Sequence, residues 1–148
     1  MASLESFRAP TRPLTDQLRR VPLFAALPTD RRGCLELLRE GALFEVPAGV
    51  EIVAPGDAAA LLVVTEGALA DDGGTRVWSA GSYLGVAEAL GGLPFTDAVR
   101  TVAPTLLYRL DGALVAELMT RCPAIAASLR ADFAPAARRA DFTPTASI

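Results

Sequence analysis

The sequence predicts a mostly β protein with flanking helices, in which short strands form a sandwich or barrel. From residue 42 onward, short apolar runs alternate with glycine, proline and aspartate at close intervals, as in strands joined by tight turns. A short helix rich in alanine and leucine, predicted over residues 84–92, interrupts this rhythm, and helical patterns precede and follow the β region. The predicted strands are residues 42–46, 50–53, 61–65, 68–70, 75–79, 98–102 and 106–110.

The length of the chain, 148 residues, suits one folded domain with short tails. Residues 1–14 contain serine and proline with little periodicity, so they are predicted to form a flexible N-terminal arm. The folded domain is predicted to span residues 15–133. Residues 134–148, which contain two prolines, are predicted to be a C-terminal tail.

The helices are predicted from their end signals. Asp30 is a plausible N-cap and Gly41 a suitable stop for the helix before the first strand. Asp111 can cap the helix that follows the last strand, and Pro123 can open another. The predicted helices outside the β region are residues 15–20, 30–40, 112–121 and 123–133.

Two local features have simple structural interpretations. Asp72-Gly73 predicts a two-residue hairpin turn with positive φ at both positions, and it lacks the alternating ligands of a calcium loop. Cys34 and Cys122 have no neighbouring cysteine. We expect both to be small buried apolar residues without a redox or catalytic role.

The composition excludes several classes of function. The chain has no histidine, and all fourteen basic residues are arginine. Ser-His or Cys-His nucleophile pairs, histidine-ligated metal sites and Schiff-base lysines are therefore impossible. An enzyme would have to use carboxylates alone, and no such pair is recognisable, so we expect no catalytic activity.

Charge and hydropathy indicate where the chain acts. The formal net charge is −3, so nucleic-acid binding is not expected. No apolar run approaches the about 18 residues of a membrane-spanning helix, and the N-terminus lacks the apolar stretch of a secretion signal. We therefore expect a cytoplasmic protein with no membrane association. The abundance of alanine, arginine and proline without lysine suggests a bacterial genome rich in G and C.

In its order of elements, the chain resembles the cyclic nucleotide-binding domain family, which includes catabolite activator protein and the regulatory subunits of protein kinase A. The resemblance covers roughly residues 18–130 and implies a jelly-roll β-barrel with N-terminal helices, a short cassette helix and C-terminal helices. The matching segments are VPLFAAL at 21–27, FEVPAG at 44–49, PGD at 55–57 with LLVV at 61–64 and Gly67, GSYLG at 81–85, VR at 99–100 and LYRLD at 107–111.

In that family the ligand lies in a phosphate-binding cassette, where a glutamate bonds the ribose 2′-hydroxyl and an arginine pairs with the phosphate. On the family pattern, Val86 stands in place of the glutamate and Phe95 in place of the arginine, while Asp97 replaces a small apolar residue. The resemblance implies a degenerate, vestigial cassette. Its candidate ligand-binding positions are Gly85, Val86, Ala87, Glu88, Pro94, Phe95, Thr96 and Asp97.

Losing both polar contacts would cost about 3–6 kcal/mol, or roughly two to four decades of affinity. We therefore expect no cofactor and little or no binding of cyclic AMP or cyclic GMP. In the alternative, the chain senses cyclic AMP or cyclic GMP through a non-standard pocket that uses Glu88 or Arg100. Two fates remain open for the cassette: Phe95 fills it, or it accepts a small molecule without a phosphate.

About fifteen residues follow Phe133, which leaves no room in this sequence for a DNA-binding domain or a kinase. We therefore expect a regulatory or protein-interaction module that acts by contact with an unidentified protein partner. The expected contact regions are the N- and C-terminal helices, residues 15–40 and 112–133. A homodimer through the C-terminal helices is also plausible, with an apolar face formed by Leu114, Leu118, Ile125 and Leu129.

Overall fold

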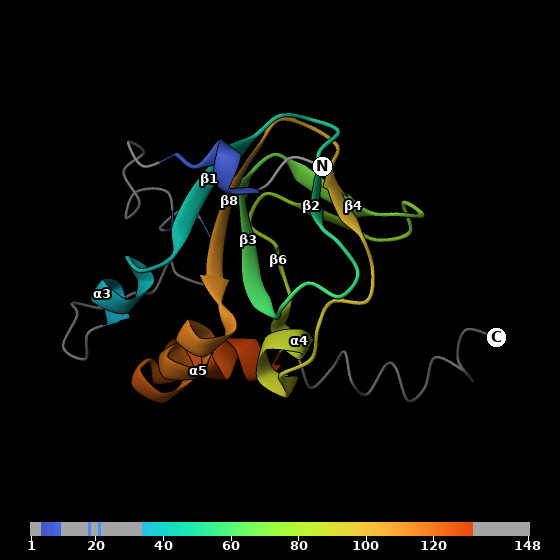
Figure 1. The fold of residues 1–148 in the computed structure, drawn as a ribbon. Helices are drawn as coiled ribbons and strands as arrows, with labels where there is room; N and C mark the ends of the chain where they lie inside the picture. Colours follow the sequence, from blue (N-terminus) through green and yellow to red (C-terminus); the bar gives the residue numbers. More distant parts are fainter. Residues whose placement is uncertain (1–3, 10–17, 19–20, 22–33, 132–148) are drawn as a thin grey trace.

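Two four-stranded antiparallel sheets form the body of the protein in a computed structural model, which describes residues 4–9, 18, 21 and 34–131 (Figure 1). The strand orders are β1-β8-β3-β6 and β2-β7-β4-β5. The elements are η1 Leu4–Phe7, α3 Cys34–Leu38, β1 Ala42–Val46, β2 Glu51–Val53, β3 Ala60–Glu66, β4 Ala68–Asp71, β5 Val77–Ser79, β6 Tyr83–Leu84, α4 Val86–Gly91, β7 Val99–Thr101, β8 Thr105–Asp111, α5 Gly112–Arg121 and a further helix, Pro123–Ala131.

The predicted fold class, mostly β with flanking helices and a jelly-roll arrangement, is confirmed. All seven predicted strands are present, with ends that differ by at most two residues. The strand that the prediction lacked is β6, which has only two residues, Tyr83 and Leu84. The helix predicted inside the β region is α4.

Strands β3 and β8 lie at the centre of the first sheet and are buried on both faces. The core between the two sheets contains side chains from both, for example Phe44, Leu62 and Val99. A second core lies on the outer face of the first sheet, where Leu61, Val63 and the other alternate residues meet the helices. A strand covered on both sides needs apolar residues at successive positions, which explains the run Leu61-Leu-Val-Val64.

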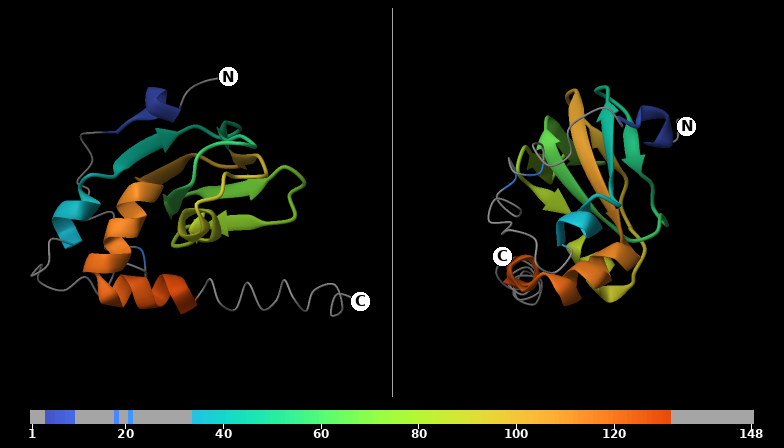
Figure 2. Two further views of the ribbon diagram at one scale, coloured as in Figure 1. Left: turned by 60° about the horizontal axis from the view of Figure 1, so that its bottom comes forward. Right: turned by 90° about the vertical axis from the view of Figure 1, so that its left-hand side faces the viewer.

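The helices cover one face and one end of the barrel (Figure 2). Leu118, Ile125 and Leu129 are at most 4% exposed and belong to the chain's own core, and Leu114 packs against it half-buried. The apolar face that predicted a homodimer is therefore occupied within the chain. The described part of the predicted helix 30–40 is α3; the rest, the helix at 15–20 apart from Leu18, and most of the segment 21–27 lie outside the described residues.

The prediction for the cysteines was wrong in one respect. Both are buried, but they are joined in a disulfide that links α3 to the end of α5. Their Cα atoms lie 5.9 Å apart although 88 positions separate them in sequence. Only the packing of α3 against α5 brings them together, so sequence spacing could not reveal the pair.

The hairpin between β4 and β5 forms, but the predicted turn is wrong. Asp72 and Gly73 do not adopt positive φ; the left-handed residue is Gly74, with φ of 70°. The loop is longer than two residues, and it is closed by hydrogen bonds from the Gly74 amide to the Asp71 carbonyl (3.0 Å) and from the Arg76 amide to the Asp71 carboxylate (3.1 Å).

The described part of the predicted N-terminal arm packs on the barrel. Residue Ala9 donates its amide hydrogen to the Leu43 carbonyl at 2.8 Å, and Arg8 forms an isolated bridge to Phe44. The remainder of residues 1–14 and the tail 134–148 lie outside the described residues.

Within the described residues, no single helix is both long and apolar enough to cross a membrane. The pair Gly112–Arg121 and Pro123–Ala131 meets the length and composition criteria only when the two are joined, and it is bent by 116°.

Candidate functional site

Gly85 begins the cassette helix α4 and fixes its position against β3. Its φ is 95°, a conformation that favours glycine. A Cβ atom here would lie 2.0 Å from the Ala60 carbonyl oxygen and 3.2 Å from the end of the Phe95 ring. The absence of a side chain therefore allows α4, β3 and Phe95 to meet at one point.

Two backbone hydrogen bonds tie Phe95 to the turn that follows β2. Its amide donates to the Asp57 carbonyl at 2.9 Å, and its carbonyl accepts from the Gly56 amide at 2.7 Å. The ring is 6% exposed and belongs to the core between the sheets. The Gly-Asp turn after β2 thus holds an apolar side chain inside the barrel.

A small cavity remains beside Phe95, and we call it the cassette pocket. Its volume is about 40 Å³, whereas a pocket for a small-molecule ligand measures about 300–1,000 Å³. Five of the eight predicted site residues line it: Gly85, Glu88, Phe95, Thr96 and Asp97. In its present form, the cassette pocket is too small for a nucleotide.

The other three predicted positions do not line this pocket. Val86 is half-buried and packs against the core beneath the helices, away from the pocket. Ala87 and Pro94 are exposed. Glu88, in contrast, does line the pocket. A six-residue helix is too short for its facing to be fixed by periodicity alone.

Arg76 is a pocket residue that the sequence analysis missed. Its guanidinium lies 3.4 Å from the Asp97 carboxylate and 3.7 Å from that of Asp71. It also stacks over the Trp78 ring, 5.1 Å from the centroid. The two residues are two apart, so strand alternation could have placed them on one side. Arg100 does not line the pocket and pairs instead with Asp72 at 3.4 Å.

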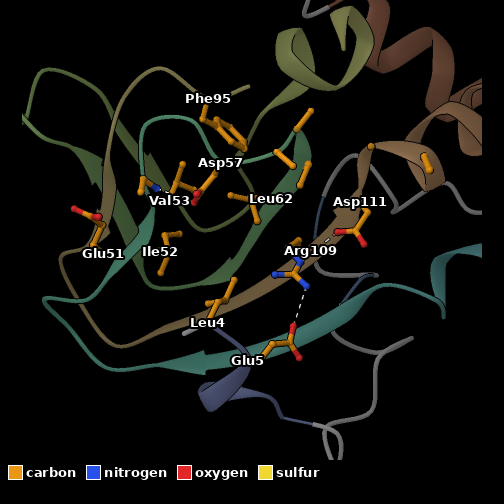
Figure 3. Close-up of a pocket in the computed structure, with 16 residues that line it drawn as sticks. Leu4, Glu5, Glu51, Ile52, Val53, Asp57, Leu62, Phe95, Arg109 and Asp111 are labelled. Carbon is orange, nitrogen blue, oxygen red and sulfur yellow. Dashed lines mark hydrogen bonds and ion pairs between the residues drawn. The ribbon is translucent and has the colours of Figure 1, made fainter. Parts of the chain in front are cut away.

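A second, larger cavity of about 780 Å³ opens on the other side of Phe95 (Figure 3). We call it the inter-sheet cavity, because β2 of one sheet and β3 and β8 of the other line it. Its residues come from four separate parts of the chain, 4–5, 51–62, 95 and 109–113, so no local motif could predict it. The apolar lining includes Leu4, Ile52, Val53, Leu62 and Phe95.

Arg109 lies on the inner side of β8 at this cavity. Its guanidinium is 2.9 Å from the Glu5 carboxylate and 3.5 Å from that of Asp111, and it lies over the Phe44 ring. Asp111 is the N-cap residue of α5, as predicted, but its side chain makes no capping hydrogen bond.

Several solved structures have a fold similar to that of this chain. A candidate cyclic nucleotide-binding protein from Geobacter metallireducens GS-15 matches with a TM-score of 0.67 and 20% identity, over 85% of this chain and 96% of that one. The Thermus thermophilus catabolite activator protein matches with a TM-score of 0.64 and 25% identity, over 82% of this chain and 60% of that one. The chain thus spans less than two thirds of the Thermus protein.

The sensor domain of the transcriptional regulator DNR from Pseudomonas aeruginosa matches with a TM-score of 0.65 and 19% identity, over 86% of this chain and 91% of that one. No protein-family model and no curated protein matches the sequence. Sheet order, cassette helix and structural neighbours agree, so the chain has the cyclic nucleotide-binding domain fold.

Proposed function

We propose that this chain is a non-catalytic regulatory or protein-interaction module whose cassette does not bind cyclic nucleotides. The observation that carries the proposal is the burial of Phe95, the residue at the family's arginine position. Its ring lies in the core between the sheets and leaves about 40 Å³ in the cassette pocket. A nucleotide would have to displace the buried ring of a residue whose backbone is fixed by two hydrogen bonds.

The charges around the cassette pocket support the same proposal. Asp97 and Glu88 contribute carboxylates, which repel a phosphate. Arg76 contributes the cation, but it already pairs with Asp97 and Asp71. A phosphate that recruited Arg76 would take the guanidinium away from both carboxylates, so Arg76 does not replace the family's arginine.

Calorimetric titration of the full chain with cyclic AMP and with cyclic GMP tests the proposal. We expect no binding at nucleotide concentrations below about 1 mM, because the losses of 3–6 kcal/mol argued above correspond to roughly two to four decades of affinity. Micromolar binding would contradict the proposal. It would favour the alternative, a nucleotide sensor with a non-standard pocket in which Glu88 takes part.

Restoring the family's contacts gives a second test. In F95R/D97A the pocket gains a guanidinium and loses the opposing carboxylate, so cyclic AMP affinity is expected to rise at least tenfold. The matched control is F95R/D72A, which removes an equally exposed carboxylate outside the pocket. We leave Val86 unchanged, because its side chain packs beneath the helices. If F95R/D97A folds and gains no affinity, the cassette alignment is wrong.

We further propose that the output is contact with another protein through the outer side of the helical layer. The inner side is unavailable, since Leu118 and Ile125 are buried in the chain. Glu117 and Arg121 form an exposed pair on the outer side of α5, 3.3 Å apart. Charge reversal, E117R, is expected to abolish capture of a partner from the native host, whereas D72R on the distant hairpin leaves it intact.

A further inference from the structure

The inter-sheet cavity is not used by the proposed function. At about 780 Å³ it falls within the range of small-molecule sites, about 300–1,000 Å³. It is some twenty times larger than the cassette pocket, and Phe95 lines both. The Phe95 ring, which fills the cassette pocket, thus also lines the larger inter-sheet cavity.

The walls of this cavity combine an apolar floor with a charged mouth. Ile52, Val53, Leu62 and Phe95 supply apolar surface from the core between the sheets. Such a surface favours a flat or branched hydrocarbon body. In the view of Figure 3, Asp57 lies between Phe95 and Val53, and the side chains of Glu51, Glu5, Arg109 and Asp111 lie farther out.

The charges at the mouth are unbalanced. Four carboxylates line the cavity, those of Glu5, Glu51, Asp57 and Asp111, against one guanidinium, Arg109. Arg109 is engaged by the Glu5 and Asp111 carboxylates. The cavity therefore favours a cation and disfavours an anion.

We propose that the inter-sheet cavity binds a small organic cation made of an apolar ring system and an ammonium group. The ring system lies on the apolar floor. The ammonium group lies at the two lining carboxylates that do not pair with Arg109, those of Glu51 and Asp57, of which Asp57 also accepts a hydrogen bond from the Ala54 amide at 2.9 Å. This proposal does not depend on whether the cassette pocket binds nucleotides.

The cavity lies at the start of α5, so a bound ligand would contact the helical part of the protein. Asp111, Gly112 and Ala113, at the start of α5, line it. The Gly112 amide donates to the Ala59 carbonyl at 3.2 Å, which ties the start of α5 to the residue just before β3. A bound molecule would touch both sides of this connection.

Three probes with one ring system test the proposal by calorimetry on the full chain: tryptamine, the neutral tryptophol and the anionic indole-3-propionate. We expect tryptamine to bind at least tenfold more tightly than indole-3-propionate, with tryptophol between them. Equal affinities, a preference for the anion, or no binding of tryptamine at millimolar concentration would overturn the proposal.

Two pairs of variants locate the binding. E51Q is expected to weaken tryptamine binding about fivefold, since it removes one unit of charge near the ammonium group, while E36Q on α3 leaves it unchanged. A58F places a ring at the mouth of the cavity and is expected to abolish binding. A87F, at an exposed position of α4, is expected to leave binding unchanged. Unaltered binding in A58F or in E51Q would show that the probe lies elsewhere. None of these titrations involves a nucleotide, so their failure is distinguishable from failure of the proposed function.

Discussion

Gly85 provides a sharp test at the scale of single residues. Gly85 and Gly56 have nearly the same φ, 95° and 93°, so alanine at either position meets about 1–2 kcal/mol of backbone strain. Only at Gly85 would the new Cβ also collide with a carbonyl oxygen, that of Ala60; at Gly56 nothing lies within 4 Å. We expect Gly85→Ala to lose at least about 1–3 kcal/mol more of the free energy of unfolding than Gly56→Ala.

Urea denaturation of both variants measures this difference. Equal losses would mean that α4 can move away from β3 without cost, and the rigid position assigned to the cassette helix would then be incorrect.

At the same scale, the directions of side chains were only partly predictable from the sequence. Alignment with the family placed Phe95 at the arginine position, and the structure adds that its ring is buried. The facing of Val86 and Glu88 could not be predicted, because it depends on how α4 docks on β3 and α5. Arg76 was missed because its place at the pocket depends on the pairing of its guanidinium with Asp97, 21 positions away in the sequence.

At the scale of elements, the disulfide between α3 and the end of α5 has a measurable consequence. It closes a loop of 88 residues in the unfolded chain, which in the chain-entropy model corresponds to about 4–5 kcal/mol of stability. We expect a reductant to lower the midpoint of urea unfolding of the wild-type chain. The double variant Cys34→Ser/Cys122→Ser is expected to be insensitive to the reductant. A wild-type midpoint that does not change on reduction would contradict this prediction.

Elements with strong periodicity were predictable. The strands β1, β3 and β8 and the helix α5 follow from apolar runs and clear end signals. Strand β6 was not, because two residues carry no pattern; it exists only through its pairing with Leu62 and Val63 of β3. The inter-sheet cavity is likewise a product of tertiary packing, since η1, β2, β3, β8 and α5 all contribute to it.

At the scale of the whole molecule, the chain has no lysine that would titrate at alkaline pH, so the change of its stability above pH 10 is simple to interpret. Tyr108 is buried beneath the helices and donates to the Leu38 carbonyl at 2.5 Å. Burial raises the pKa of Tyr108 well above its ordinary value of 10.0. Above pH 10 the unfolded chain therefore loses a proton that the folded chain keeps, so the stability conferred by the neutral phenol is present below pH 10 and declines as the pH rises.

We expect the free energy of unfolding to fall by up to about 1.4 kcal/mol per pH unit above pH 10. Y108F has no phenol at this position, so its stability is expected to fall less over the same interval, after an initial loss of about 0.5–1.5 kcal/mol for the missing hydrogen bond. Urea unfolding of both proteins from pH 8 to 11 measures the two slopes. Identical slopes would mean that Tyr108 does not titrate differently in the folded and unfolded chain.

The position of Trp78 has a practical consequence. It is the chain's sole tryptophan, and it lies in the cassette pocket with the Arg76 guanidinium over its ring. Its intrinsic fluorescence therefore comes from one known place. Any event that shifts Arg76 should change the emission of that indole, so the protein carries its own optical reporter and needs no attached dye.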